Sequence, residues 1–149
     1  MIDKNDQIIL DELKDDGSLS TYKISKKTGI PQTTVLNRIR KLIELKIIKK
    51  YSIEIDHKKL GKNVKALIFA KVNKEAERKK HGNIGDLESK LLKYDLIINV
   101  KRLMGKNDFV IEVIAENVEE LNHFLIKKIR MLDEISETET IIILDEWSK

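Results

Sequence analysis

The chain of 149 residues carries a formal net charge of +4, is 41% hydrophobic and 36% charged, and contains no cysteine. This size and composition indicate one ordered domain or two small ones, and the lack of cysteine excludes disulfides, zinc–thiolate sites and thiol nucleophiles, in agreement with a reducing cytosol. The first residues contain no apolar signal segment, and no apolar run approaches the roughly 20 residues that cross a bilayer, so we expect a cytoplasmic protein without membrane contacts.

Three short helices are predicted at the start of the chain. Asp3 is suited to cap the first helix, which ends near residues 15–17. Ser20 can cap the second, which stops at Gly29 because glycine adopts a positive φ angle without penalty. Pro31 supplies a fixed φ angle suited to the first turn of the third helix. The connection is tight, so the second and third helices should meet at a steep angle.

The third helix has two chemically different faces. Five apolar residues share one arc of the helical wheel and are expected to face the core: Val35, Leu36, Ile39, Leu42 and Ile43. The other side places short hydrogen-bonding groups near the helix start and long basic groups beyond them, as needed when a helix enters the DNA major groove by its N-terminal half. The candidates are Gln32, Thr33, Thr34 and Asn37 for base edges, and Arg38, Arg40, Lys41, Lys49 and Lys50 for phosphates.

Positive charge is concentrated around this helix. Residues 21–50 contain nine Lys or Arg and one acid, Glu44. Residues 1–63 hold 14 basic and 9 acidic residues, a balance of +5, whereas residues 64–149 hold 15 and 16, a balance of −1. A helix face that is only solvated would normally mix both signs. With the steep helix pair, this distribution predicts a helix-turn-helix that binds double-stranded DNA.

Alternating strands and helices are predicted in the rest of the chain. Residues 51–55 alternate apolar and polar side chains like a half-buried strand, and residues 56–62 read as a polar linker. The further elements are strands near 64–73, 97–104, 108–115 and 136–145 and helices near 84–93 and 118–130, with a solvated loop at 78–81 that could touch DNA in an assembled dimer. The order β-α-β-β-α-β is that of a ferredoxin-like fold.

The predicted fold class is therefore α+β, with a three-helix, winged-helix-like N-terminal domain and a ferredoxin-like C-terminal domain. The expected boundaries are residues 1–50 for the DNA-binding domain, 51–63 for a connecting strand and linker, and 64–149 for the ferredoxin-like domain. Helices on one face of a four-stranded sheet leave its other face bare. Such an apolar face would be an aggregation hazard unless a second sheet covered it, and this predicts a homodimer.

Several motifs, in their order and spacing, resemble the Lrp/AsnC family of transcription regulators across residues 2–145. They are D-x-x-D-x-x-I-L-x-x-L from Asp3 to Leu13, Gly29-Ile30-Pro31, Val35-Leu36-x-Arg38-Ile39-x-x-Leu42, Ile47-Ile48-x-x-Tyr51, Leu60-Gly61 and Gly105-Lys106-Asn107-Asp108-Phe109. The resemblance implies binding to two-fold symmetric DNA sites, contact with the transcription machinery, and a C-terminal domain that assembles dimers into tetramers or octamers. It also implies no cofactor beyond an amino-acid effector bound between dimers.

The same resemblance assigns effector residues. The ligand would lie by the turn Met104 to Asp108, with Asp108 pairing its ammonium group and backbone groups near Gly105 meeting its carboxylate. The full set of candidates is Met104, Gly105, Lys106, Asn107, Asp108, Thr138 and Thr140. Lys106 either favours an acidic ligand or points to solvent. Without the family, the same residues read as an ordinary hairpin turn that binds nothing.

The end of the third helix departs from the family pattern. Many relatives have glycine just before the apolar pair at residues 47–48, but this chain has Lys46. We expect either a strained left-handed residue there or a different helix cap.

Two other functions are compatible with these folds. Ferredoxin-like domains host many enzymes, but His57, His81 and His123 have no ligand spacing, and the chain has no Gly-rich phosphate loop and no cysteine. We therefore expect no enzymatic activity. A nucleoid-packaging protein could use the same fold to bind DNA with little sequence preference. The ratio of specific to non-specific affinity separates that function from a sequence-specific regulator.

Overall fold

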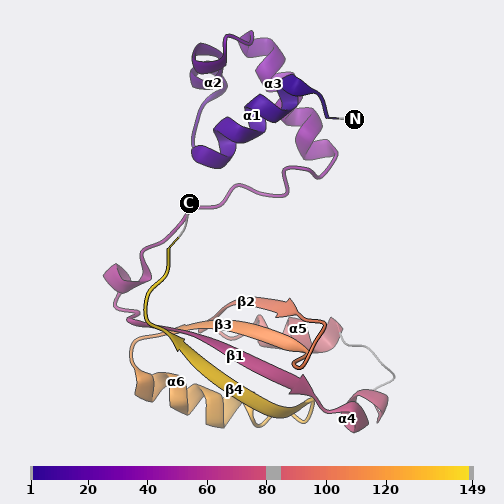
Figure 1. Cartoon of the computed structure of the whole chain (residues 1–149), viewed down its shortest axis with the longest axis vertical. Coiled ribbons are helices and arrows are strands. Elements are labelled where there is room, and N and C mark those ends of the chain that lie inside the picture. Colours follow the sequence, from indigo (N-terminus) through magenta and orange to yellow (C-terminus); the bar gives the residue numbers. More distant parts are fainter. Residues whose placement is uncertain (1, 80–84, 148–149) are drawn as a thin grey trace. The chain divides into compact units, whose positions relative to one another are not determined.

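The computed structural model describes residues 2–79 and 85–147, and the chain divides into two compact units, Met1–Ile55 and Asp56–Lys149 (Figure 1). Each unit has its own cluster of buried apolar side chains. The boundary between the units lies within the segment 51–63 that was expected to connect two domains.

The first unit contains three helices: α1 (Lys4–Asp15), α2 (Thr21–Thr28) and α3 (Gln32–Glu44). The starts of α1 and α2 are set by side chains that satisfy free backbone N–H groups, whereas α3 has no side-chain cap. The carboxylate of Asp3 accepts a hydrogen bond from the first turn of α1, and the hydroxyl of Ser20 does the same for α2. The three predicted helices are thereby confirmed.

Two residues with positive φ angles end the helices of this unit. Gly29 ends α2 in the left-handed conformation (φ 73°), as expected. Lys46 follows α3 with a φ angle of 56°, so the left-handed alternative is confirmed without the help of glycine. A side chain in this conformation costs roughly 1–2 kcal/mol. Pro31 occupies the N-cap position of α3, one residue earlier than predicted.

The core of the first unit is small. Its central cluster consists of Ile9, Ile24, Ile30, Val35 and Ile39, and Leu42 of α3 is also buried. Leu36 and Ile43 were expected to be buried with them, but they are 37% and 44% exposed. The prediction was wrong for these two because α1 and α2 cover only a narrow arc of α3, and both residues lie at its margins.

The strand predicted at residues 51–55 is not formed. Residues 49–56 have no regular secondary structure, and the side chain of Ile53 is 81% exposed. The prediction was wrong here because a strand requires a hydrogen-bonded neighbour, and within the described residues none pairs with this segment. The alternating pattern indicates which side chains would share one face of a strand. It does not show that another strand lies beside this segment to form hydrogen bonds with it.

The second unit is a four-stranded antiparallel sheet with the strand order β2-β3-β1-β4. The strands are β1 (Val64–Val72), β2 (Ile97–Arg102), β3 (Phe109–Ala115) and β4 (Ile135–Ile143). The helices are η1 (His57–Leu60), α4 (Lys74–Lys79), α5 (Gly85–Leu91), α6 (Val118–Phe124) and its π-helical continuation η2 (Leu125–Ile129). The ferredoxin-like α+β prediction is confirmed, with α4 as an addition.

Helix α4 corrects part of the loop prediction. Residues 78–79 were assigned to a solvated loop but belong to this short helix. The remainder of that loop, Lys80 and His81, and the predicted helix start at Ile84 lie outside the described residues. None of the helices in the described parts of the chain is long and apolar enough to span a membrane.

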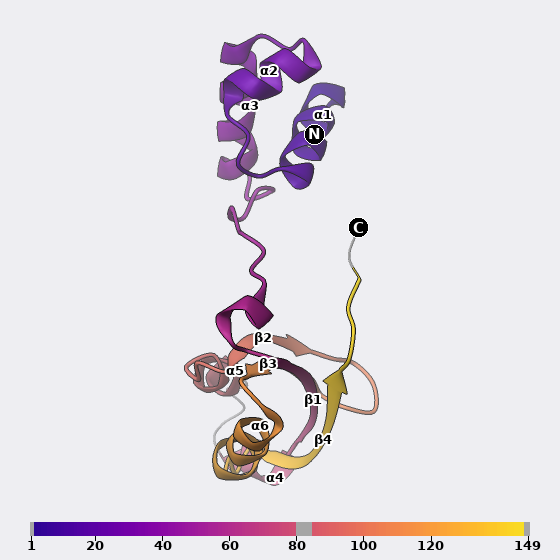
Figure 2. The same ribbon diagram turned by 90° about the vertical axis from the view of Figure 1, so that its left-hand side faces the viewer.

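One face of the sheet is covered by α5 and α6 (Figure 2). Ala66, Ile68 and Ala70 of β1 are at most 1% exposed beneath these helices. Residues that alternate with them, such as Leu67 and Phe69, point to the opposite face and are only partly buried. The sheet therefore has one buried face and one bare face within a single chain, as predicted. The bare face is not wholly apolar as expected, because Lys65 and Glu112 share it with Leu67 and Phe69.

Candidate nucleic-acid interface and effector site

The outward face of α3 presents the predicted DNA-contacting groups. Thr33, Asn37, Arg40 and Lys41 are exposed, and Thr34 is half-buried. Four of the predicted residues line a shallow surface hollow, whose lining consists of Asp3, Thr34, Asn37, Arg38 and Lys41. A hydroxyl, an amide and an ammonium group thus share one concave surface, a mixture suited to base edges and phosphates.

The remaining DNA candidates lie at the two ends of this helix. The side-chain amide of Gln32 donates a hydrogen bond to the hydroxyl of Thr21 at 3.3 Å, which ties the first residue of α3 to the first residue of α2. Lys49 and Lys50 are exposed in the segment after α3. Neither forms an ion pair with another described residue.

Arg38 differs from the other predicted phosphate contacts because its guanidinium is already paired with two carboxylates. Its Nη1 atom donates to Asp3 Oδ2 at 2.5 Å and to Asp6 Oδ1 at 2.8 Å. Asp6 is only 1% exposed, and it is the one buried charged residue among those that the structure describes. Arg38 therefore neutralises a buried carboxylate.

The two carboxylates are also held by the backbone of α1. Asp3 accepts from the N–H of Asp6 at 2.9 Å, and Asp6 accepts from the N–H of Asp3 at 3.1 Å, which forms a reciprocal capping box. The Arg38 guanidinium and the Asp6 N–H hold the pKa of Asp3 below its usual value. The Asp3 N–H and then Arg38 lower the pKa of Asp6 in the same way.

The pairing of Arg38 with Asp3 and Asp6 was missed in the sequence. Asp3 and Asp6 were assigned to the cap and the dipole of α1, and these roles are correct locally. The available signal was the position of Asp6, three residues before Ile9 on the same side of an amphipathic helix. A carboxylate on an apolar face needs a cation, because burying an unpaired charge is costly.

Asp108 has a structural contact at the candidate effector turn. Its Oδ2 atom accepts from the backbone N–H of Val72 at 2.8 Å, where the pairing of β1 with β4 shifts register. The carboxylate thereby caps a backbone group that this irregularity leaves free. Met104, Gly105 and Lys106 are exposed in the same turn, and Asn107 is half-buried.

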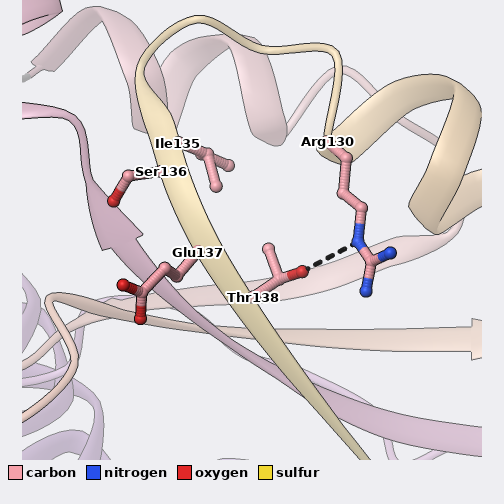
Figure 3. A pocket seen from close by; sticks show the side chains of 5 residues that line it. All are labelled: Arg130, Ile135, Ser136, Glu137 and Thr138. Carbon is pink, nitrogen blue, oxygen red and sulfur yellow. Dashed lines mark hydrogen bonds between the residues drawn. The ribbon is translucent and has the colours of Figure 1, made fainter.

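Thr138 lies in a separate pocket on β4, which Figure 3 shows together with its lining residues Arg130, Ile135, Ser136, Glu137 and Thr138. The Nε atom of Arg130 donates to the hydroxyl of Thr138 at 3.1 Å. Arg130 follows the π-helical turn η2, and its own N–H bonds to Leu125. Arg130 was missed in the sequence, since a π-helical turn changes which residues face the sheet.

The two groups of effector candidates lie on opposite sides of β1. Thr138 pairs with Ala70 of β1, and Ala70 pairs on its other side with Phe109, the residue after Asp108. Two strand spacings separate them by about 10 Å. The backbone positions of the turn and of Thr138 are therefore about two strands apart, although the Asp108 side chain reaches the Val72 N–H of the strand between them.

Charged side chains of β1 and of the turn at residues 104–108 attract Glu137 of β4. Lys71 pairs with Glu137 at 2.6 Å, and this hydrogen bond lowers the pKa of Glu137, with Lys106 adding a smaller attraction.

The hydroxyl oxygen of Thr140, the other threonine candidate, is buried without a hydrogen-bond partner. No group of three or more His, Asp or Glu side chains in the described parts of the chain is arranged to hold a metal ion.

A helix-turn-helix unit joined to a ferredoxin-like unit defines a class of DNA-binding regulators, and comparisons with known proteins agree. Residues 2–49 match the winged helix-turn-helix DNA-binding family, and residues 69–149 match the Lrp/AsnC ligand binding domain. The chain is 34% identical over 144 residues to the HTH-type transcriptional regulator FL11 of Pyrococcus furiosus, covering 97% of this chain and 90% of that protein. It is 30% identical over 144 residues to the transcriptional regulator AzlB of Bacillus subtilis, covering 97% and 89%.

Solved structures show the same architecture. Escherichia coli AsnC has a TM-score of 0.82 at 27% identity, covering 98% of this chain and 94% of that one. Bacillus subtilis LrpC has a TM-score of 0.83 at 27% identity, covering 99% and 98%. A Neisseria meningitidis regulator solved as a complex with L-Met shares the fold, with a TM-score of 0.89 at 17% identity, covering 100% and 94%.

This chain belongs to the Lrp/AsnC family. It is a DNA-binding transcriptional regulator, not an enzyme, and it combines the helix-turn-helix with the family's ligand-binding domain.

The lowered pKa values predict how the first unit responds to acid. Asp3 and Asp6 contribute stability that is fully present above their unfolded pKa near 3.9 and is lost as the pH falls through their lower folded pKa values. We expect the free energy of unfolding, measured by urea titration with helical circular dichroism, to drop as the pH falls from 5 to 2. Asp6→Asn should be less stable at pH 7 and show a shallower drop. Asp11→Asn, an exposed acid of the same helix, is the control, and an equally shallow drop there would contradict the assignment.

Proposed function

We propose that this regulator is a homodimer that recognises a two-fold symmetric DNA site through α3 of each copy. The observation that carries the proposal is the set of free cations on and beside α3. In the described structure Arg40, Lys41, Lys49 and Lys50 form no ion pair, whereas Lys27 of α2 is paired with Glu12 at 2.9 Å. Unpaired cations can replace the counterions of a DNA backbone. Such contacts with DNA would place the protein in the cytoplasm.

The two kinds of DNA contact divide along α3. Thr33, Thr34 and Asn37 would meet base edges, with Gln32 in the first turn, because short polar side chains can approach the floor of the major groove. Arg40, Lys41, Lys49 and Lys50 would hold phosphates. Arg38 is removed from this set, because its Nη1 atom is bonded to two carboxylates, one of them buried, and these neutralise its charge within the unit.

The three predicted parts of the chain keep their roles in this proposal. Residues 1–50 would read DNA, 51–63 would connect, and 64–149 would bind the effector and a second copy. The bare face of the sheet supports self-association. It carries three cations and three anions at alternate positions of the strands, namely Lys65, Lys71, Lys101, Glu112, Glu137 and Glu139. A face with balanced charge can pair with a copy of itself.

An amino acid is the effector that we propose. The ammonium group would pair with Asp108, whose second carboxylate oxygen has no partner among the described hydrogen bonds, and the backbone near Gly105 would meet the carboxylate. The separation of this turn from Thr138 and Thr140 supports a site completed by another copy, as in an assembly of dimers. The L-Met complex of the Neisseria meningitidis structure agrees with this class of ligand.

Sequence-specific regulation and DNA packaging are distinguished by selection of bound sequences from a random duplex library, followed by competition with bulk DNA at fixed salt. We expect a two-fold symmetric site and a specificity ratio of roughly a thousand or more. Asn37→Ala should cost about 1–3 kcal/mol at the selected site and leave bulk affinity unchanged. Asn5→Ala on the exposed side of α1 is the control. Binding without enrichment would favour packaging, and an equal loss on all sequences would make Asn37 a backbone contact.

The dimer is tested at the ion pair between Lys65 and Glu112, which are 2.8 Å apart on the bare face and 26% and 19% exposed in one chain. A second sheet would bury this pair, and removing one partner would leave an uncompensated charge. In sedimentation velocity, Lys65→Met should weaken the dimer at least about tenfold, because it leaves Glu112 without its cation. Adding Glu112→Leu should restore most of the affinity, because Glu146, the second partner of Lys65, is 61% exposed. Lys59→Met, in the exposed pair with Asp56 outside the sheet, is the control. A dimer unaffected by Lys65→Met would place the interface elsewhere.

The effector site is tested by calorimetric titration of the twenty amino acids. Asp108→Asn keeps an oxygen for the Val72 N–H but removes the charge, so it should lower ligand affinity by roughly tenfold or more without loss of stability. Asp108→Ala should reduce both the ligand affinity and the stability of the fold, because it also leaves the Val72 N–H without its hydrogen-bond acceptor. Asp133→Asn, an exposed acid before β4, is the control. Full ligand affinity in Asp108→Asn would contradict the ammonium assignment.

A further inference from the structure

We propose that Arg38 is a positioning residue, which clamps α3 to the N-terminus of α1 and so sets the orientation in which α3 presents its base-reading side chains. Arg38 lies on the margin of the DNA-facing surface and its side chain is 24% exposed, yet its guanidinium pairs with Asp3 and Asp6 of the same unit. The inference rests on the proposed reading of DNA by α3. It adds a determinant of specificity that touches no base.

The clamp is a three-residue cluster with fixed geometry. A single guanidinium nitrogen of Arg38 bridges Asp3 and Asp6. The capping box holds both carboxylates against the backbone of α1. Neither acceptor can therefore move without breaking the first turn of that helix, and α3 is tied to a rigid point.

The apolar core cannot provide the same restraint. Burial of apolar surface is favourable but non-directional, so it holds helices together without fixing one rotation of α3 about its axis. Only Val35, Ile39 and Leu42 of this helix are buried, and the residues at the margins of that arc stay partly exposed. Hydrogen bonds between a guanidinium and carboxylates are directional. They supply the restraint that this small core lacks.

The cluster adjoins the reading surface directly. Asp3 and Arg38 line the same hollow as Thr34, Asn37 and Lys41. Loss of the clamp would therefore displace the groups that meet base edges by small amounts. Specific contacts depend on such placement, whereas phosphate contacts between long flexible cations and a uniform backbone tolerate it.

The experiment measures the affinity of the full chain for its selected duplex and for bulk DNA over a series of salt concentrations. For Arg38→Met we expect the ratio of the two affinities to fall roughly tenfold, as for the loss of one well-placed base contact. The slope of log K against log salt should stay unchanged, because no phosphate contact is lost. Arg38→Lys should restore part of the ratio, since an ammonium can still reach a carboxylate.

Asp6→Asn provides the second variant. Asp6 is too deeply buried to touch DNA, and removing its negative charge would strengthen DNA binding if charge alone mattered. The clamp instead predicts that Asp6→Asn lowers the ratio as Arg38→Met does. Partial unfolding cannot imitate this result, because it lowers both affinities by the same factor and cancels in their ratio. If Asp6→Asn does not fold, Asp3→Asn replaces it, because Asp3 is 54% exposed.

Lys41→Gln is the matched control in the same hollow. Lys41 is a proposed phosphate contact, so its loss should make the slope of log K against log salt shallower by about 0.9 per copy. The ratio of the affinity for the selected duplex to that for bulk DNA should not change. The same behaviour in Arg38→Met would overturn the inference and return Arg38 to the phosphate contacts. An unchanged ratio in both Arg38→Met and Asp6→Asn would also overturn it. A wild-type chain without any specificity would instead refute the proposed sequence-specific function.

Discussion

Burial on one side only is the constraint on which both units of this protein depend. In the first unit α3 buries a narrow arc around Val35 and Ile39, and in the second the sheet buries the face that contains Ile68. Small domains have too little apolar surface to enclose an element completely. The opposite face of each element therefore remains available to a partner. In α3 that face is polar and basic, as DNA requires, and in the sheet it carries apolar side chains and balanced charge, which suits the proposed second copy.

Charged side chains around α3 fall into two groups with different consequences. Lys27 and Arg38 have carboxylate partners inside the unit, so their charge is already neutralised locally. Arg40 and Lys41 have none among the described residues, so their charge is available to a polyanion. Net charge along the sequence counts both groups alike. Only the free group can release counterions from DNA, and only the paired group can hold the helices in a fixed arrangement.

Local chemistry explains which parts of the fold could be predicted from the sequence. The helix starts at Asp3 and Ser20 and the stop at Gly29 were correct, because caps and positive φ angles depend on neighbouring residues. The strand at residues 51–55 was wrong, because it required a pairing partner that the pattern does not supply. The role of Arg38 was missed for a related reason. Its partners lie 32 and 35 residues away, and only the packed helices bring them together.

The central position of β1 has a consequence for the proposed regulation. β1 lies between the backbone of Asp108 and that of Thr138, and in the proposed assembly a small ligand would contact these two kinds of group from different copies. A ligand bound in this way stabilises only the assembled form, and by mass action it shifts the chain toward that form. Assembly in turn sets how many α3 helices are linked, and linked helices gain avidity for paired DNA sites without any new contact. An effector at this position would therefore change DNA binding without altering the reading surface itself.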